Sequence, residues 1–570
     1  MRQLPIIFSL ALLVFFSFDA LAELKGPHGL RLMVVTNGDD DGPGSLRAAI
    51  NAVNNDPAVD PTILVAIHQS GIALLSPLPA ITRPGTTIDA RDVQASNGNV
   101  DSPSLVLNGA KAGPCNGFVI AAKNVTIAGI QAYNFSAAAF LVLSDGAQLR
   151  ANSAIGTGRG IALINASGGA FSYNTFTDTQ LSGIAIWNGG FNLISHTTIT
   201  EHAEAYGIVL VNSSYNRIEE SEVDKGILTS LPAIDILGNS QGNQLVNLEV
   251  NKGRVSYSWG GPPGIRVEKA GMNTVLNQVN VGNEYIVTST ADDGSPGTLR
   301  DAINKQVPTG GAALHIPRIV FMIPTTAANP IATISALGSY MVYYGTIVDA
   351  TTQPGYNDLG AWHRAIQIEG HLAGRNGCFN INNGSVLGFS IMGFQGTGIL
   401  VNGAMFASVS VMGNNIGVDG MGRNKWGNLG NGIELDYSNF TSIIGNVISG
   451  NGGDGIQVNS SDWTLIGSNF IGLASDGITP MGNGYSGIHA GPDVSGLDIG
   501  VRTVNDPKLG SPGGNFIAAN GQWGIFSRAT NTAITGNSVG VNILGQSMPD
   551  LESPEINLVD APINAPKRRK

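Results

Sequence analysis

The sequence is poor in charged residues and has almost no cysteine. Asp, Glu, Lys and Arg make up 12% of the 570 residues, and 42% are hydrophobic. An average soluble protein has about 25% charged residues, so this chain lacks the composition of a disordered protein. Its two cysteines, Cys115 and Cys378, are too few for a disulfide framework, and we expect them to stay unpaired. The fold must therefore be stabilised by its hydrophobic core.

Basic residues are few, and they are clustered in one place only. The formal net charge is −11, and the single basic cluster is Lys567–Lys570 at the C-terminus. Binding to phosphate groups requires clustered Lys and Arg, so the composition excludes nucleic acid and disfavours anionic membranes as partners. Residues 546–570 contain prolines and end in this cluster, and we expect them to form a disordered tail.

Long hydrophobic runs are absent beyond the N-terminus. Arg2 is followed by the apolar run Ile6–Phe18 and by Ala20–Ala22, which is the order of segments in a secretion signal. The run is shorter than the ~18 to 20 residues that span a bilayer, and no later segment is long enough. We predict that residues 1–22 are a cleaved signal peptide. The mature chain would then lack a transmembrane segment and be secreted or held in the cell envelope.

Glycine is abundant, and one glycine-containing motif occurs twice. Glycine accounts for 77 of 570 residues, about twice the usual 7%, which suits many short strands joined by tight turns. Segment 34–51 recurs as segment 286–304 with one additional residue, and both contain Asp-Asp-Gly followed by Leu-Arg and Ala-Ile-Asn. We interpret the chain as a tandem duplication, with domains at residues 23–282 and 283–545.

Each copy of the motif predicts a short helix. Ser45 and Thr298 can cap the helix N-terminus, and apolar residues follow at the spacing of one helix face. A single amphipathic helix before a strand-rich body would cover the open end of a stack of strands, whose exposed edge otherwise promotes aggregation. We therefore assign the helix as an end cap in each domain.

The body of each copy repeats a Gly-Ile dipeptide at the start of an alternating strand. The isoleucines of these repeats are Ile161, Ile184, Ile208, Ile399, Ile433, Ile456, Ile488 and Ile525. The base spacing is about 23 residues, a length shared by leucine-rich repeats, but the Leu-x-x-Leu-x-Leu pattern is missing. We predict an all-β fold, a right-handed parallel β-helix in two tandem copies, with Asn side chains stacked at its corners.

The duplicated motif resembles the start of a known group of proteins. Pro-Gly-Ser-Leu-Arg, followed by Ser76–Thr82 and Thr87–Ala90, is similar to the start of bacterial exported β-helix proteins that have the pectin-lyase-like fold and a Cys-Ser-Leu-Arg-Glu-Ala type motif. Val348–Tyr356 is a further feature of that group. The chain departs from the motif by lacking its Cys and its Glu, at Gly44, Gly297, Ala48 and Asp301. The resemblance implies fold and export and no particular reaction.

Alternate residues of a strand point to opposite faces, so the first and third residues after each Gly-Ile dipeptide should face outward. Successive coils are about 4.8 Å apart, and these outward residues therefore form a row along the β-helix. In the first copy the row is mainly apolar, from Ala162 to Leu237. We expect an inserted loop, another domain or a subunit to cover it. In the second copy the row is polar and contains Leu400, Asn402, Glu434, Asp436, Gln457, Asn459, His489, Gly491, Phe526 and Arg528.

The polar row has the residue types of a saccharide site. Glu434 and Asp436 lie two residues apart on one strand, about 6.6 Å between backbones, near the separation of the carboxylates in inverting glycosidases. His489 can carry a proton, Arg528 can hold a sugar carboxylate, and Phe526 can stack on a sugar ring. The candidate catalytic residues are Glu434, Asp436, His489 and Arg528, and the candidate substrate-binding residues are Asn402, Gln457, Asn459 and Phe526. The alternative is a solvated strand face that binds no ligand.

Other motif matches are better explained as turns. Segments 450–455 and 482–487 fit the dinucleotide glycine pattern, but each leads into a Gly-Ile strand and not into a helix. Asn37–Gly42 matches only the first half of a calcium loop, because Ala48 occupies the place of the required Glu. His196 and His202 are six residues apart and do not have the spacing of a helical zinc pair. We predict no cofactor, with calcium as a weak alternative, and no metal site.

Three functions fit this sequence. The chain could bind a carbohydrate polymer without turnover, process a polyuronide as a hydrolase or lyase, or serve as a protein-binding adhesin or structural envelope protein. It lacks the Gly-His-Gly and Arg-Ile-Lys motifs of polygalacturonases and the Asp-Pro-His motif of alginate epimerases, which disfavours those chemistries. We favour binding without turnover.

Overall fold

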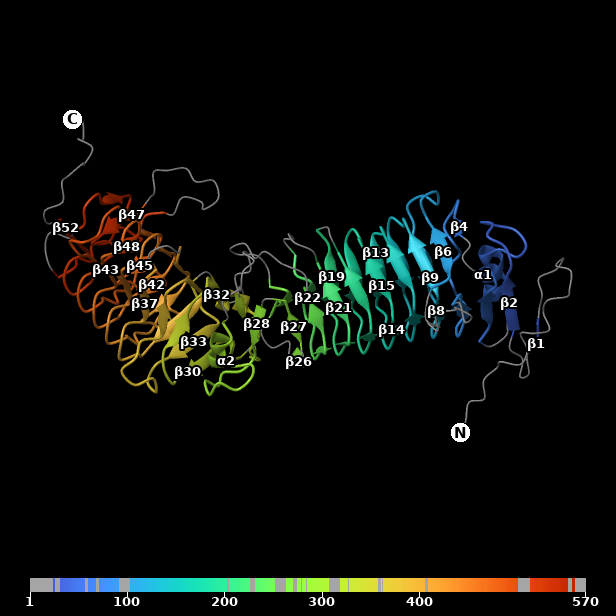
Figure 1. The fold of residues 1–570 in the computed structure, drawn as a ribbon, viewed down its shortest axis with the longest axis horizontal. Coiled ribbons are helices and arrows are strands. Elements are labelled where there is room, and N and C mark those ends of the chain that lie inside the picture. Colours follow the sequence, from blue (N-terminus) through green and yellow to red (C-terminus); the bar gives the residue numbers. More distant parts are fainter. Residues whose placement is uncertain are drawn as a thin grey trace, which may run out of the picture. The chain divides into compact units, whose positions relative to one another are not determined.

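The chain, described by a computed structural model, folds into right-handed parallel β-helices with few helices, which confirms the predicted fold class (Figure 1). The structure describes residues 24–25, 31–56, 60–67, 71–91, 103–201, 204–225, 231–251, 263–269, 274–277, 279–282, 284–306, 318–326, 328–356, 360, 362–404, 408–500, 513–551 and 556–558. The predicted signal peptide lies outside these residues. Among them, no helix is long and apolar enough to cross a membrane.

The chain divides into two compact units. The first comprises residues 1–229, 244–248 and 276–278, and the second comprises residues 230–243, 249–275 and 279–570. A short strand, β26 (Val275–Asn277), has residues in both units. The predicted domain limits at residues 22 and 282 stay predictions.

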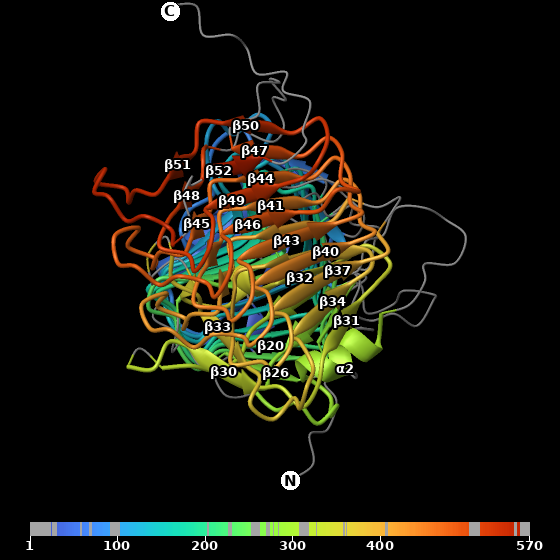
Figure 2. The ribbon, with the colours of Figure 1, turned by 90° about the vertical axis from the view of Figure 1, so that its left-hand side faces the viewer.

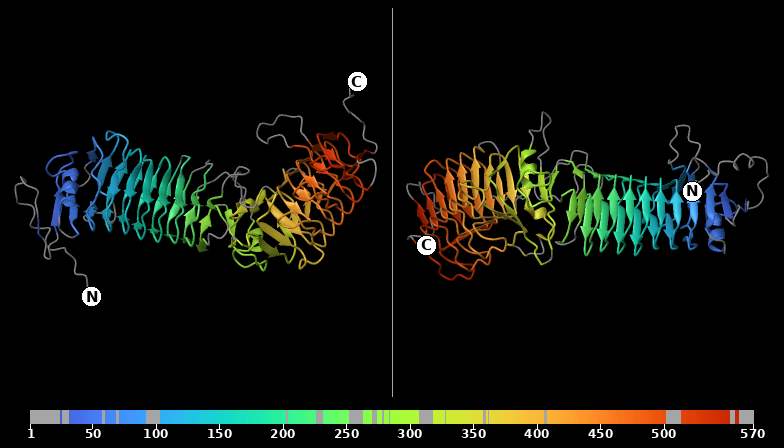
Figure 3. Two further views of the ribbon diagram at one scale, coloured as in Figure 1. Left: turned by 180° about the vertical axis from the view of Figure 1, so that it is seen from behind. Right: turned by 90° about the horizontal axis from the view of Figure 1, so that it is seen from below.

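Each regular coil of the first unit contributes one strand to each of three sheets, seen in side view in Figure 3. Sheet I contains β7 (Phe118–Ile120) and β10 (Ala138–Val142), followed by the three strands with a Gly-Ile dipeptide: β13 (Arg159–Ile164), β16 (Ser182–Trp187) and β19 (Tyr206–Val211). Sheet II contains β1 (Leu24–Lys25), β2 (Arg31–Val35), β3 (Thr62–Val65), β5 (Thr87–Asp89), β8 (Thr126–Ala128), β11 (Gln148–Arg150), β14 (Ala170–Ser172), β17 (Leu193–Ser195), β20 (Arg217–Glu219) and β23 (Gln244–Val246). Sheet III contains β4 (Gly71–Ala73), β6 (Leu105–Asn108), β9 (Ile130–Tyr133), β12 (Ser153–Ile155), β15 (Thr175–Thr177), β18 (Thr198–Thr200) and β21 (Glu222–Asp224).

The second unit also has three long sheets, and within it β22 (Ile234–Leu237) pairs in parallel with β25 (Ile265–Val267). Sheet IV contains β31 (Tyr340–Val342), β34 (Phe379–Ile381), β37 (Ile399–Asn402), β40 (Ile433–Asp436), β43 (Ile456–Asn459), β46 (Ile488–Ala490), β49 (Ile525–Ser527) and β52 (Ile556–Leu558). Sheet V contains β24 (Glu249–Val250), β27 (Asn280–Val281), β28 (Glu284–Val287), β29 (Arg318–Phe321), β32 (Thr346–Asp349), β35 (Gly384–Leu387), β38 (Ser410–Met412), β41 (Ser442–Ile444), β44 (Leu465–Gly467), β47 (Asp498–Gly500) and β50 (Ala533–Thr535). Sheet VI contains β30 (Ala332–Ser335), β33 (Ile366–Glu369), β36 (Phe389–Met392), β39 (Asn415–Ile416), β42 (Val447–Ile448), β45 (Phe470–Ile471), β48 (Phe516–Ile517) and β51 (Ser538–Val539).

The Gly-Ile dipeptides mark the coil period. Their isoleucines are direct partners in adjacent strands, Ile184 with Ile161 and Ile208 in sheet I, and Ile433 with Ile399 and Ile456 in sheet IV. All are buried in the core. Longer spacings correspond to inserted loops, such as the loop closed by an antiparallel bridge between Val418 and Lys425.

Part of the segment predicted to be a disordered tail is ordered. Residues 546–551 belong to the described chain, and Gln546 accepts a hydrogen bond from Asn542 through its side chain at 2.7 Å. Strand β52 pairs in parallel with β49. Ile556 is partly buried against the core of the second unit, and this apolar contact explains why the ordered chain continues past residue 545.

Buried asparagines connect successive coils at the corner between sheets V and VI, as the sequence predicts. The members of this ladder are Asn414, Asn446, Asn469, Asn515 and Asn537, and each side-chain Nδ2 donates to the Oδ1 of the next at 2.8–3.1 Å. Asn446 Nδ2 also donates to the carbonyl of Val411 at 3.0 Å. A second ladder runs through Asn428, Asn451, Asn483 and Asn520 to Asp550. The ladders satisfy polar groups that the corners bury.

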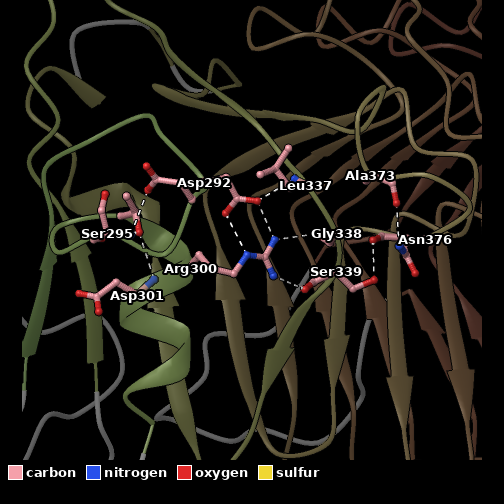
Figure 4. Close-up of polar contacts among 12 residues, drawn as sticks. Asp292, Ser295, Arg300, Asp301, Leu337, Gly338, Ser339, Ala373 and Asn376 are labelled. Atoms are coloured by element: carbon pink, nitrogen blue, oxygen red, sulfur yellow. Dashed lines mark hydrogen bonds and ion pairs between the residues drawn. The ribbon is translucent and has the colours of Figure 1, made fainter.

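Both copies of the duplicated motif form a capped helix, α1 (Leu46–Asn54) and α2 (Leu299–Asn304), with Ser45 and Thr298 as the N-cap residues. In the second copy, Arg300 pairs with Asp292 at 2.6 Å and donates to the carbonyls of Gly338 and Ser339 (Figure 4). Arg47 makes the equivalent contacts with Asp40 and with two carbonyls before β5. The arginine therefore fastens each helix to the first coils of its unit. A short 3-10 helix, η2 (Ala350–Thr352), follows β32.

Backbone geometry explains why glycine occupies positions 44 and 297. Gly44 has φ +80°, and an added Cβ would lie 2.4 Å from Thr36 Oγ1. Gly297 has φ +86°, and its Cβ would lie 2.6 Å from Thr288 Oγ1. Residues with side chains seldom adopt such angles, and there is no space for one here.

The apolar row of the first copy is shielded at most positions. Ala162, Ala185 and Val209 are buried, whereas Ile164 is exposed. The predicted row also included Asp235, which belongs to the second unit and whose carboxylate pairs with Arg266 on β25 at 2.5 Å. An apolar face with this little exposed surface does not by itself indicate a binding site.

One carboxyl group points into the core of the first unit. Glu201 is buried, and its Oε1 accepts a hydrogen bond from Thr179 Oγ1 at 2.5 Å. Burial raises the pKa of Glu201 to about 7, and the nearby Lys225 only partly opposes this effect. The folded chain therefore holds this proton more tightly than the unfolded chain does.

We predict that replacing Asn446 with Ala destabilises the second unit by about 2–4 kcal/mol, because several buried hydrogen-bonding groups would lose their partner. Urea unfolding measures the change. The exposed strand residue Asn402, replaced with Ala, is the control and should change stability by less than about 0.5 kcal/mol. Equal effects of the two substitutions would contradict the role of the ladder.

We predict that Glu201→Gln removes a pH dependence of stability. A pKa raised from 4.5 to about 7 gives stability that is fully present below pH 4.5 and is lost as the pH rises through 7. At pH 8 the Gln variant should therefore be more stable than the wild type, by up to about 3 kcal/mol, and near pH 4 the two should be alike. Thermal unfolding across this pH range tests the prediction, and parallel pH profiles would refute it.

Candidate functional site

The polar row lies on the outer face of sheet IV, whose strands are stacked in Figure 2. Direct partners in successive strands are Leu400, Glu434, Gln457, His489 and Phe526. A second set of direct partners is Asn402, Asp436 and Asn459. Arg528 comes directly after β49 and is exposed. The structure thus brings the predicted residues to one face, whereas their role stays a prediction.

Glu434 is held by two hydrogen bonds. Its Oε2 accepts from Thr397 Oγ1 and from Asn431 Nδ2, both at 3.1 Å. Asn431 Nδ2 also donates to Gln457 Oε1 at 2.6 Å, and Gln457 Nε2 lies 3.5 Å from Asn459 Oδ1. Side chains on three consecutive coils therefore form one hydrogen-bonded network that fixes the direction of the Glu434 carboxylate.

Asp454 and His489 form a dyad beside this network. The backbone N–H of Asp454 donates to Asn431 Oδ1 at 2.8 Å, and Asp454 Oδ1 accepts from the backbone N–H of Ser486 at 2.8 Å. The other oxygen, Oδ2, lies 3.1 Å from His489 Nδ1. A carboxylate in this position favours a proton on Nδ1, which leaves Nε2 as the proton acceptor. Asp454 is buried and the His489 side chain is partly exposed, so the dyad can meet a ligand through the histidine.

The row ends in an aromatic cluster. The rings of His489 and Phe526 meet edge to face with 5.0 Å between centroids, and Trp523 lies 4.8 Å from Phe526. The guanidinium carbon of Arg528 is 5.6 Å from the centre of the Phe526 ring. Aromatic rings beside hydrogen-bonding groups are typical of surfaces that bind amphipathic ligands.

Two of the predicted site residues make fewer side-chain contacts than the others. Neither Asp436 nor Asn402 uses its side chain in a hydrogen bond or ion pair that the described residues define, although Asp436 is the direct partner of Asn459. The polar network therefore centres on Glu434 and Gln457. Asp436 is the last residue of β40, two residues after Glu434.

The sequence prediction missed the residues that support the row. They stand directly before the Gly of each Gly-Ile dipeptide and are Thr397, Asn431, Asp454, Ser486 and Trp523. Their shared position was visible in the sequence. Side chains alternate between the two faces only within a strand. Because these residues precede the strands, the alternation does not predict where their side chains point.

The partial calcium motif forms a turn. Asn37 Oδ1 accepts from the N–H of Asp39, and Asp41 Oδ1 accepts from the N–H of Gly42. Asp40 pairs with Arg47. These oxygens are engaged within the cap, and the calcium match stays a weak prediction without support from this geometry.

Comparison with known proteins gives limited similarity. The profile of the family described as "Periplasmic copper-binding protein (NosD)" matches residues 80–286. No curated protein matches the chain. Similar solved structures include the catalytic domain of a GH87 α-1,3-glucanase in complex with nigerose, at 12% identity, covering 79% of this chain and 71% of that chain with a TM-score of 0.33.

Two lyases are also similar in structure. The pectate lyase Pel9A is 13% identical, with 63% of this chain and 78% of that chain covered and a TM-score of 0.28. A PL6 family polysaccharide lyase from Pseudopedobacter saltans is 9% identical, with 74% and 90% covered and a TM-score of 0.23. Similarity of this degree says nothing about the ligand or reaction of the present chain.

The described residues do not form a copper site in the matched stretch. No group of three or more His, Cys, Asp or Glu side chains in the described part of the chain could hold a metal ion. Cys115 is a free, buried thiol whose pKa is raised by burial, which disfavours the thiolate that binds metal. His196 is paired with Glu220 at 2.6 Å and stacked on Tyr173. His202, which the sequence places near it, lies outside the described residues.

Proposed function

We propose that the protein is exported and binds a carbohydrate polymer along the outer face of sheet IV. The pattern of residues 1–22 supports export, as does the match to a family described as periplasmic. We also propose that the two capped β-helices arose by duplication, since Arg47 and Arg300 make equivalent contacts in the two caps. The described residues of the matched stretch give no support for copper binding.

The observation that carries this proposal is the hydrogen-bonded row from Glu434 to Phe526. It presents carboxylate, amide, imidazole and aromatic groups on consecutive coils, about 4.8 Å apart along one direction. Sugars offer many hydroxyl groups and apolar ring faces, and a polymer repeats both along its length. A row of hydrogen-bonding side chains that ends in a cluster of aromatic rings complements such a ligand.

Binding without turnover requires only that these groups are held in place. Asn431 links Glu434 to Gln457, and the strand pairing fixes the spacing of the coils. A face that is ordered before binding loses little conformational entropy when the ligand arrives. Alternatively, the protein is an adhesin, and the same row binds a protein partner.

The Asp454–His489 dyad favours a second candidate function, a polysaccharide hydrolase or lyase. His489 Nε2 could accept a proton, while Asp454 holds the ring in one tautomer. Glu434 lies on the same face two coils away and could act as the partner acid or base. Arg528 and the aromatic rings would then position the sugar.

We predict that Gln457→Ala weakens binding of the protein's polysaccharide about tenfold, or 1.4 kcal/mol, because Gln457 lies at the centre of the row. Affinity electrophoresis or calorimetry with a panel of glucans, xylans, pectins and alginates would identify the ligand and measure the loss. Gln148→Ala, an exposed strand residue of the first unit, is the matched control and should bind normally. Binding of no polysaccharide by the wild-type protein would refute the proposed function.

The enzymatic candidate predicts that Glu434→Gln lowers turnover of a polysaccharide at least a hundredfold while the protein stays folded. The assay follows new reducing ends and unsaturated ends, with circular dichroism as the folding control. Glu222→Gln, on β21 of the first unit, should leave turnover unchanged. Normal turnover by the Glu434 variant would exclude this role, and binding with no product from the wild type would leave the binding function alone.

A further inference from the structure

The coils that carry the centre of the polar row contain acidic residues and no Lys or Arg. Residues 431–500, all of which the structure describes, contain no Lys or Arg. The same stretch has seven acidic residues: Glu434, Asp436, Asp454, Asp462, Asp476, Asp493 and Asp498. Neither Glu434 nor Asp436 forms an ion pair with a described residue, and both lie on the outer side of β40. Within the described part of the chain, neither carboxylate therefore has a Lys or Arg partner.

Exposed aromatic side chains stand at both ends of these strands. Tyr437 follows β40 and is 56% exposed, and Phe440 and Trp463 are 51% and 63% exposed at the next corner. Tyr485 is 53% exposed before β46, and Trp523 precedes β49. Single exposed aromatics are common, but a set that flanks one polar face on both sides indicates a ligand with apolar surfaces.

The backbone holds these rings in place. Tyr437, Phe440 and Trp463 have φ angles of +50°, +55° and +56°, the left-handed geometry that recurs at corners of these coils and that fixes the direction of each side chain. The backbone N–H of Phe440 donates to the backbone carbonyl of Asp462, and the backbone N–H of Trp463 donates to that of Ser495. These hydrogen bonds hold the corners of successive coils in register. At Gly496 an added Cβ would lie 2.9 Å from the Trp463 ring. The missing side chain at Gly496 leaves the space that this ring occupies.

We infer that the ligand of this face is a neutral polysaccharide and not a polyuronide; this inference rests on the proposed function and specifies its ligand. Unpaired carboxylates accept hydrogen bonds from sugar hydroxyls, but they repel the carboxylate that every residue of a polyuronide carries. Exposed aromatic rings stack on the apolar faces of uncharged sugar rings. The basic side chain of the row is Arg528, which lies on its last coil, and the imidazole of His489 faces Asp454.

A matched pair of polymers tests the charge argument. Polygalacturonate and its fully methyl-esterified form share one backbone and differ in charge, and uncharged glucans and xylans extend the neutral set. At low ionic strength, neutral polymers should bind at least tenfold more tightly than polygalacturonate. The double variant Glu434→Gln with Asp436→Asn should raise the affinity for polygalacturonate about tenfold. Tighter binding of polygalacturonate by the wild type, or no gain in the double variant, would overturn the inference.

A second variant tests the aromatic rim. Trp463→Ala should weaken binding of the neutral polymer about tenfold with unchanged circular dichroism, because Trp463 is an exposed corner residue outside the core. Phe191→Ala is the matched control, since Phe191 is an exposed corner aromatic of the first unit with φ +57°. Equal affinity of the Trp463 variant and the wild type would overturn the role of the rim.

Different results would refute carbohydrate binding and the preference for a neutral polymer. Failure of the wild-type protein to bind any polymer of the panel would refute carbohydrate binding and, with it, the ligand class. Preferential binding of polygalacturonate, weakened by the Glu434 and Asp436 substitutions, would keep carbohydrate binding and refute the neutral ligand. Preferential neutral binding that depends on Trp463 supports both.

Discussion

The rest of the structure depends on the register between successive coils. Parallel backbone hydrogen bonds set the rung spacing, and the Asn ladders lock the corners, because each buried Asn side chain binds both the next Asn and the backbone of a neighbouring coil. A buried amide without these partners would destabilise the fold by more than a neutral hydrogen bond contributes. Register therefore decides which residues become neighbours, and residues 23 or more positions apart in sequence meet on one face.

The candidate face follows directly from that constraint. In strands such as β40 and β43 of sheet IV, isoleucine and its alternate residue fill the core, which leaves the intervening positions for the outer surface. Selection can change those outer residues without disturbing the core. The two units show this freedom, because the equivalent row is mostly apolar and shielded in the first and polar in the second. The arginines of both caps meanwhile make the same contacts, since any such stack needs a closed end.

Periodicity made the fold and the row of Glu434, Gln457, His489 and Phe526 predictable, since both require only a count of residues between Gly-Ile dipeptides. It could not supply the partners of those residues. Asp454 lies 35 positions before His489, and the inserted loops vary the distance from coil to coil. The contacts of Arg300 with carbonyls more than 35 residues away depend on how the first coil closes. The order at β52 was missed because the sequence around Ile556 lacks the Gly-Ile signal, although its side chain packs on the core.

The use of glycine before each inward isoleucine has a consequence for how such a chain can change length. Coils are nearly interchangeable units, and Asn446 and Asn469, one coil apart, occupy equivalent places in the ladder. An in-frame gain or loss of one whole coil would lengthen or shorten the face by one rung and leave the side chains of the other rungs in place. Insertion or deletion of a single residue within a strand would instead turn its outer side chains inward. Gain or loss of whole coils can therefore lengthen or shorten the face in discrete steps, independently of the side chains on the other rungs.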